Sequence, residues 1–467
     1  MTKAKQNSEV SLLEAAIVIG IVLLTLGIPL ILIPNLAPHV PLISAIVLLL
    51  LYGLTRSKMS FSNLQAGMIN SVSEGMGAIY LFFFIGILIA SLMFAGSIAT
   101  LMHVGLKIIS CKLFYLAVFV LTAILGVSIG SSLTTVATLG VALLGLARAL
   151  DLNQAITTGA IVSGAFFGDK MSPLSDTTSL AAGIVGIDLF THIKNMLSTT
   201  VPGFIISALF FASLSPFNTT VNSDVLNNFD LAITKTGLVH WSAFIPLIAL
   251  IMLSLLRLPS VISLILVSAI SLIIGNFLHP VSLSLLGDLL FSGFKSNSLT
   301  CQKLSPDIVN ILDRGGINSM FFSITIVILA LSLGGLLFTL GIIPTILQNI
   351  QTFLKTRLQV TLAVAITAIS VNLIVGEQYL SILLAGKTFV PVYKRLDLPR
   401  KFLARTLEDA GTVINPLVPW SVCGVFISNI LSVKTVDYAP FAIFCYISVW
   451  ISLSTSYKET PRQARNK

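Results

Sequence analysis

Residues 164–178 read GAFFGDKMSPLSDTT and interrupt an apolar segment that extends from 154 to 188. Pro173 removes a backbone hydrogen-bond donor, so together with Gly168 it predicts a helix that is unwound in its middle. A break of this kind in a membrane helix is tolerated where it is buried in protein or lines a cavity. The stretch therefore predicts a membrane protein whose functional site is built around an interrupted helix.

The composition of the whole chain agrees with a membrane protein. The 467 residues include 27 Lys+Arg and 18 Asp+Glu, so only 10% are charged, while 55% are hydrophobic. Soluble domains carry roughly 25% charged residues. This shortage excludes a soluble enzyme and a nucleic-acid-binding protein, despite the net charge of +9. We expect an all-α polytopic protein in a lipid bilayer, without disulfides, and with histidines such as His192 at the ends of spans.

Apolar segments define the expected crossings, since a membrane helix needs about 20 apolar residues. These segments are 12–33, 38–54, 76–101, 193–215, 239–256, 258–279, 318–341 and 437–456. Residues 113–149 and 358–394 are apolar on both sides of a polar centre but too short for two crossings, so each predicts a re-entrant hairpin. Residues 400–431 contain EDAGTVINPLVP and predict a second broken helix. The polar residues 59–74 predict a surface helix or a loop.

These segments form an internal repeat. Gly130-Ser131-Ser132 precedes Gly376-Glu377-Gln378 by 246 residues, and Leu150-Asp151-Leu152 precedes Leu396-Asp397-Leu398 by the same number. We also pair Ser172-Pro173-Leu174 with Asn415-Pro416-Leu417, 243 residues later. Each half then holds five transmembrane helices and one hairpin, giving about ten helices and two hairpins. Because five is odd, the two halves have opposite orientations.

The distribution of basic residues predicts the orientation. With both termini inside, 18 of the 27 Lys and Arg residues lie on the cytoplasmic side, as the positive-inside rule requires. The predicted parts are a cytoplasmic N-terminus (1–11), a first repeat (12–215), an extracellular loop (216–238), a second repeat (239–456) and a cytoplasmic C-terminus (457–467). Inverted repeats with paired broken helices are typical of secondary transporters, which we expect in the plasma membrane. The chain is not expected to be an enzyme.

Ionisable residues inside apolar spans are functional candidates, because each costs on the order of 2.5–3.5 kcal/mol at membrane depth. In the first repeat Asp169 and Asp176 supply carboxylates, and Lys170 would balance their charge. The hydroxyls of Ser172, Thr177 and Thr178 and the carbonyls of the unwound backbone add oxygen ligands suited to Na⁺. Two structural interpretations stay open: an Asp169–Lys170 ion pair, and an N-cap at Ser175–Thr178 that only satisfies freed backbone.

The second repeat and the hairpin tips supply the other candidates. They are Glu408, Asp409, Thr412 and Asn415 in the broken helix, Glu377 and Gln378 at the second hairpin tip, and Ser131 and Ser132 at the first. Glu408 and Asp409 could instead belong to the cytoplasmic end of their helix near Arg405. We expect Na⁺ to bind at Asp169, Asp176 and Asp409. A buried carboxylate holds a proton or a cation, and this competition is the basis of cation/proton exchange.

The sequence resembles the NhaC family of Na⁺/H⁺ antiporters from about residue 12 to 455. The resemblance rests on 164–197, which contains the GDKMSPLSDTT block, and on 130–145, 376–387 and 405–424. It implies exchange of Na⁺ for H⁺, no cofactor besides these transported ions, and a homodimer in which a transport domain moves against a scaffold. Nothing resembles an ATP-binding loop, so an ion gradient would supply the driving force.

Several positions depart from the family pattern: Leu133, Asn415 and the neighbourhood of Glu377. They line the expected site, so the substrate stays open. The alternative is Na⁺- or H⁺-coupled antiport of a small organic acid or amino acid, such as malate/lactate exchange. A channel or a sensor on a transporter scaffold is the remaining class.

Overall fold

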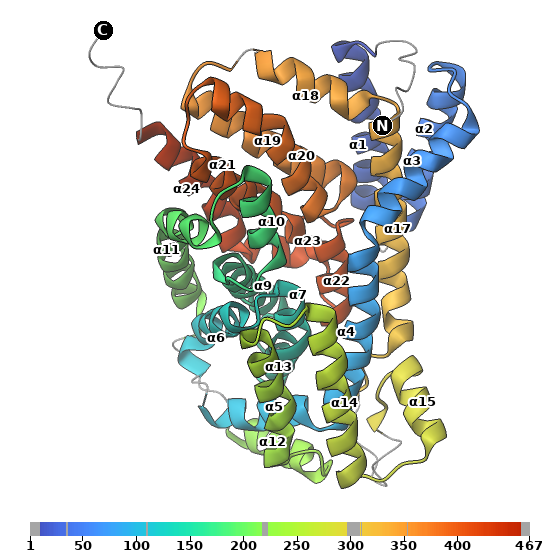
Figure 1. Cartoon of the computed structure of the whole chain (residues 1–467). Coiled ribbons are helices and arrows are strands. Elements are labelled where there is room, and N and C mark those ends of the chain that lie inside the picture. Colours follow the sequence, from blue (N-terminus) through green and yellow to red (C-terminus); the bar gives the residue numbers. More distant parts are fainter. Residues whose placement is uncertain are drawn as a thin grey trace.

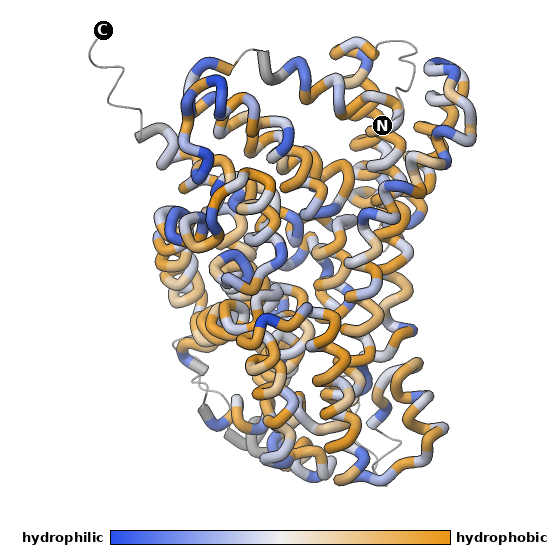
Figure 2. Tube along the Cα trace, in the orientation of Figure 1, coloured by the Kyte–Doolittle hydropathy of each residue, from blue (hydrophilic) through white to orange (hydrophobic). Residues whose placement is uncertain are grey.

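A computed structural model describes residues 10–33, 36–108, 111–216, 223–296, 309, 311–352 and 354–458. Within these ranges every regular element is helical, which confirms the predicted class (Figure 1). Seven helices are long and apolar enough to cross a membrane, or up to nine if each of two bent pairs forms one span. Apolar residues continue along most of their length (Figure 2).

The first half contains the helices α1 to α11. They are α1 (Leu12–Leu32), α2 (His39–Thr55), α3 (Phe61–Glu74), α4 (Met76–Phe94), α5 (Ser97–Ile108), α6 (Phe114–Ile129), α7 (Ser132–Thr135), α8 (Val141–Ala149), α9 (Gln154–Met171), α10 (Asp176–Val185) and α11 (Leu189–Leu214). A π-helical turn, Val136–Gly140, joins α7 to α8. The helix α12 (Ser223–Lys235) follows, so the predicted loop 216–238 contains a helix.

The second half repeats this order. Its helices are α13 (Ile245–Leu255), α14 (Ser260–Leu278), α15 (Leu283–Ser292), α17 (Ile317–Thr339), α18 (Ile342–Thr352), α19 (Arg357–Val375), α20 (Gln378–Arg395), α21 (Arg400–Leu407), α22 (Val422–Leu431), α23 (Thr435–Tyr438) and α24 (Ile443–Lys458). Between α21 and α22 lie a π-helical turn, Glu408–Thr412, and a 3-10 turn, Asn415–Leu417.

The backbone shows the register of the repeat. Three pairs of residues with positive φ are each 246 residues apart: Gly130 and Gly376, Asp151 and Asp397, Gly186 and Ser432. The N-caps follow the same spacing: Ser131 and Glu377 cap α7 and α20, and Ser175 and Ser421 cap α10 and α22.

This register corrects one predicted pairing. Pro173 corresponds to Pro419 rather than to Pro416, because each of these two prolines lies two residues before a serine N-cap. The prediction followed the wrong one of two nearby prolines, and it placed this one pair three residues out of register with the other two.

The two halves run in opposite directions. In Figure 1, α4 leads into α5 at the lower end of the molecule, whereas α17 leads into α18 at the upper end. The predicted span 76–101 is wrong in one respect, because it divides at Gly96 (φ +75°) into α4 and α5. Within the predicted stretch 59–74, Phe61–Glu74 form the helix α3, which packs against α17: a Cβ on Gly67 would lie 1.9 Å from Thr339 Oγ1.

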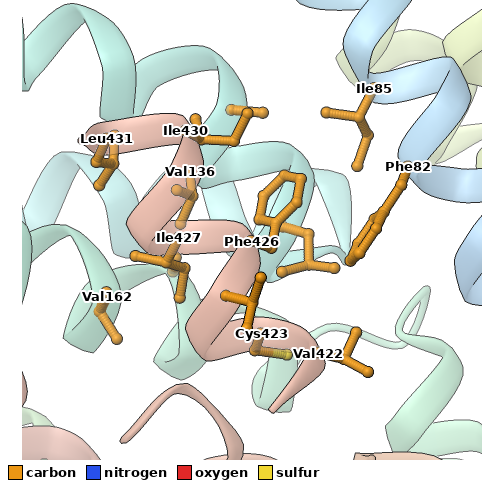
Figure 3. Close-up of a cluster of buried hydrophobic side chains, with 14 of the residues drawn as sticks. Phe82, Ile85, Val136, Val162, Val422, Cys423, Phe426, Ile427, Ile430 and Leu431 are labelled. Carbon is orange, nitrogen blue, oxygen red and sulfur yellow. The ribbon is translucent and has the colours of Figure 1, made fainter. Parts of the chain in front are cut away.

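The broken helix of each half packs into the hairpin of the other. The helix α22 lies between α4 and the first hairpin, where the Phe426 and Phe82 rings stack 5.1 Å apart (Figure 3). On the other side, α10 packs against α20, where a Cβ on Gly386 would lie 2.6 Å from Ile184 Cγ2. Because each broken helix packs into the hairpin of the other half, the hairpin tips and the helix breaks lie close together.

Glycines allow α6 and α9 to approach closely. A Cβ on Gly168 would lie 2.5 Å from Gly126 Cα, and a Cβ on Gly164 would lie 2.3 Å from the Phe119 carbonyl. Small residues permit this backbone contact between membrane helices. Gly168 therefore does not open the helix as predicted, since α9 continues to Met171 and the break is at 172–175.

We expect Gly168→Ala to lower the free energy of unfolding by about 1–3 kcal/mol, because the added methyl group must push α6 and α9 apart. Gly183→Ala is the matched control: nothing lies within 4 Å of its Cβ position, and Ala is the better helix former. Thermal unfolding in detergent measures both variants. Equal stability of the two variants would contradict this account of the contact.

Candidate cation site

Asp169 lies at the C-terminal end of α9 and faces the first hairpin tip. Its Oδ2 accepts hydrogen bonds from the Ser132 amide (3.1 Å) and from the Ser132 hydroxyl (2.7 Å). The tip turns at Gly130, whose φ of +73° suits glycine. Asp169 is 5% exposed, so it is a buried carboxylate with protein donors on one side.

Lys170 pairs with Asp409 and not with its neighbour Asp169. Lys170 Nζ bonds Asp409 Oδ1, and both side chains are fully buried. Thr199 on α11 donates to the same oxygen at 3.4 Å, and the Phe444 ring lies 5.8 Å from Nζ. The alternative interpretation, an Asp169–Lys170 ion pair, is therefore wrong, and the ion pair instead joins the two repeats.

Glu408 is buried without a partner. It begins the π-helical turn that also contains Asp409 and Thr412, and neither of its carboxylate oxygens has a hydrogen-bond partner. Asp409 Oδ2 and Thr412 Oγ1 are likewise buried and unpartnered. Glu408 lies within electrostatic range of Asp169, Lys170 and Asp409. Glu408 and Asp409 are both fully buried, and they directly follow α21, the helix whose last turn carries Arg405.

The second hairpin tip carries Glu377 and Gln378, both buried. Glu377 Oε2 caps α20 by accepting from the Leu380 amide at 2.7 Å, while Oε1 has no partner. Gln378 Oε1 lies 3.6 Å from the Cys423 sulfur. At the first tip, Ser131 caps α7 by accepting from the Thr134 amide at 3.3 Å.

Asn415 directs its amide group into the protein. Its Oδ1 accepts from the Cys423 amide at 2.9 Å. Its Nδ2 donates to Asn372 Oδ1 at 2.8 Å and to the Gly376 carbonyl at 3.2 Å. These bonds connect the second helix break to the second hairpin.

The hydroxyls near the first break hold backbone groups. Ser172 Oγ accepts from the Leu174 amide at 3.2 Å, and Thr178 Oγ1 donates to the Lys170 carbonyl at 3.2 Å. Thr177 Oγ1 bonds Ser175 Oγ at 3.0 Å. These contacts favour the interpretation in which Ser172 and Thr178 satisfy freed backbone, whereas Thr177 bonds a side chain.

Asp176 does not lie with the buried carboxylates Asp169, Glu408 and Asp409. It is exposed and lines a cavity of about 300 Å³ between the first hairpin tip and the α13–α14 connection. Ser131, Thr134, Arg257 and Ser263 also line it, and Ser263 Oγ is buried without a partner. Among the described residues no three His, Cys, Asp or Glu side chains converge on a metal-sized point. The expected Na⁺ site made jointly by Asp169, Asp176 and Asp409 is not assembled in this structure.

Thr199 escaped prediction, since it gave no signal besides a hydroxyl within an apolar segment. His192 lies in the first turn of α11, at a span end as expected, but it is fully buried with both ring nitrogens unpartnered. Neither burial nor the direction of a side chain on α11 follows from the local sequence.

Paired hairpins and broken helices that enclose buried carboxylates define a secondary transporter of cations. The model of the Na⁺/H⁺ antiporter family matches residues 164–457. The chain belongs to the Na⁺/H⁺ antiporter family.

Three relatives extend the comparison over most of the chain. The Na⁺/H⁺ antiporter NhaC of Alkalihalophilus pseudofirmus is 36% identical and matches 95% of this chain and 96% of its own length. NhaC of Bacillus subtilis is 35% identical over 89% of this chain and 91% of its own length. The malate-2H⁺/Na⁺-lactate antiporter of B. subtilis is 29% identical and matches 85% of this chain and 84% of its own length. The resemblance to NhaC proteins is thus confirmed.

Proposed function

We propose that this protein exchanges Na⁺ for H⁺ across the plasma membrane, with both termini in the cytoplasm. The ions would compete at Glu408 and Asp409, which lie on one turn within electrostatic range of Asp169, and Lys170 would balance charge. The observation that carries this proposal is Glu408, a fully buried carboxyl group in which neither oxygen has a hydrogen-bond partner. The NhaC relatives support the choice of ions.

Glu408 carries the proton in this scheme. An ionised carboxylate without donors is costly in a buried site, and such a group binds a proton instead. Asp169 has two donors from Ser132, and Asp409 has Lys170 and Thr199. The three carboxyl groups therefore differ in hydrogen bonding, and Glu408 is the one for which protonation removes a buried charge.

Na⁺ binding favours the ionised form of Glu408, whereas proton binding removes its charge. Asp409 Oδ2, the Glu408 oxygens and the Thr412 hydroxyl are unpartnered oxygen atoms contributed by one turn. A cation that binds there stabilises the ionised form of Glu408, so its proton leaves as Na⁺ arrives. Na⁺ also competes with the Lys170 ammonium for Asp409. Each ion thereby excludes the other from the cluster.

The test of this proposal is Na⁺-driven proton movement in proteoliposomes. An external Na⁺ pulse at equal pH should make the lumen alkaline with wild-type protein, since protons leave as Na⁺ enters. Glu408→Gln keeps the shape and removes the titrating group, so the pH response should fall at least 10-fold. Glu74→Gln, an exposed carboxylate outside the site, should respond like wild type. A full response from Glu408→Gln would refute the role of Glu408.

The cavity at Asp176 would be the access route from the cytoplasm, because it reaches the hairpin tip next to Ser132. In a chain whose native cysteines are replaced, Ser263→Cys should react with a membrane-impermeant thiol reagent applied from the cytoplasmic side. Ser268→Cys, buried on the same helix but outside the cavity, is the control and should stay unlabelled. Labelling of Ser263→Cys only from the outside would contradict the orientation.

The alternative substrate, a small organic acid or amino acid, has one observation in its favour. The same cavity holds a carboxylate (Asp176) and a guanidinium (Arg257), which together suit a zwitterion or an organic anion. Uptake of labelled dicarboxylates and amino acids, with and without a Na⁺ gradient, separates the two functions. Solute uptake without Na⁺-driven proton movement would favour the alternative.

A further inference from the structure

The repeat register pairs each site residue with a partner in the other half. With the spacing of 246 residues that the N-caps and positive-φ residues define, Asp169 corresponds to Asn415 and Ser132 to Gln378. Asn372 corresponds to Gly126, which has no side chain. The place of the first repeat's carboxylate is therefore taken by an amide in the second.

The amide of Asn415 occupies oxygens that a cation would use. Its Nδ2 donates to the Gly376 carbonyl at the hairpin tip and to Asn372 Oδ1. Carbonyl oxygens of unwound backbone at such a break are ligands for Na⁺ in transporters with this architecture. In the second repeat these oxygens already accept N–H groups.

The amide of Asn372 occupies two further backbone oxygens of this region. Its Nδ2 donates to the Gly411 carbonyl at 2.6 Å and to the Ala410 carbonyl at 3.4 Å. Asn372 and Asn415 are both fully buried. Two neutral amides thus satisfy three backbone carbonyls and one amide oxygen around the second break without any ion.

We propose that Asn372 and Asn415 are a built-in substitute for a second cation, so that the protein binds one Na⁺ per chain. This inference rests on the proposed function and adds its stoichiometry. Asn415 is accordingly a structural group that closes the hairpin tip at Gly376 to Na⁺, and not one of the Na⁺ ligands that the sequence predicted. Within the second repeat, only the Glu408–Thr412 turn then holds the transported ion.

Equilibrium binding of ²²Na⁺ to the purified full-length protein tests the stoichiometry directly. We expect one Na⁺ per chain, a Hill coefficient of 1, and loss of that binding in Asp169→Asn. Two Na⁺ per wild-type chain would overturn the inference while leaving Na⁺/H⁺ exchange intact. Wild-type protein that binds no Na⁺ would instead refute the proposed function.

Asn415→Asp tests the amide itself, since it removes two donors and adds a charge at the position that corresponds to Asp169. We expect two Na⁺ per chain and a melting temperature that rises more steeply with Na⁺ than that of wild type. Asn429→Asp is the matched control, because Asn429 also donates to a carbonyl and a hydroxyl, those of Ser319 and Ser323, away from the site. Folded Asn415→Asp protein that still binds one Na⁺ would overturn the proposal that the Asn415 amide takes the place of a second cation. If the variant does not fold, the wild-type stoichiometry decides.

Discussion

Replacing Asp169 with Asn is expected to weaken Na⁺ binding about 1000-fold and to abolish Na⁺-driven proton movement. The substitution keeps an oxygen that can accept from Ser132, so the hairpin contact survives. What it removes is a full negative charge. A unit charge about 4 Å from a cation contributes on the order of 4 kcal/mol at the effective dielectric constant of protein sites, which corresponds to roughly three decades in affinity.

Asp313→Asn is the matched control for this variant. Asp313 accepts from the amide and hydroxyl of Ser296, both at 2.7 Å, in the same arrangement as Asp169 with Ser132 but outside the site. Its variant should transport like wild type. Na⁺ affinity from equilibrium binding, and melting temperature for folding, are measured on both proteins. Wild-type Na⁺ affinity in Asp169→Asn would remove this carboxylate from the site.

The helical architecture could be predicted because it depends on local composition. A membrane helix needs a run of apolar residues, and Gly130, Gly376, Pro173 and Pro419 mark turns or breaks within the sequence itself. Dependence on local sequence features also explains the error in the register of the repeat. Pro416 and Pro419 are three residues apart, and only the N-cap at Ser421 shows which one corresponds to Pro173.

The pairing of charges could not be predicted from the sequence. Asp169 and Lys170 are neighbours in the chain, but consecutive residues on a helix point about 100° apart and do not face each other. Lys170 instead meets Asp409, 239 residues away. That contact depends on how the two repeats interlock.

The π-helical form of the turn at Glu408 could not be predicted either. A π-helical turn has no strong sequence signal, and such turns often occur at functional sites. Asp176 shows that a residue expected in the buried site can be exposed. It has polar neighbours in the sequence and lies next to the break, but its side chain lines the open cavity. Proximity in sequence to the break did not determine burial.

Neutralising one member of the Lys170–Asp409 pair is expected to destabilise the protein by about 3–5 kcal/mol, since the other charge stays buried without compensation. Lys170→Met and Asp409→Asn should each lower the melting temperature in detergent. Arg56 and Glu14, an ion pair at 3.2 Å in which Arg56 is 65% exposed, supply the control. The variants Arg56→Met and Glu14→Gln should change stability by about 1 kcal/mol or less.

The double variant Lys170→Met/Asp409→Asn separates the structural from the transport role of this pair. Because it leaves no uncompensated charge, it should be more stable than the sum of the single effects allows. It should nevertheless fail to transport, since Na⁺ then has neither Asp409 to bind nor Lys170 to displace. Recovery of stability without recovery of Na⁺-driven proton movement would show that the pair belongs to the exchange mechanism. A stable double variant with wild-type transport would show that the pair serves only the fold, and would leave Asp169 and Glu408 as the whole site.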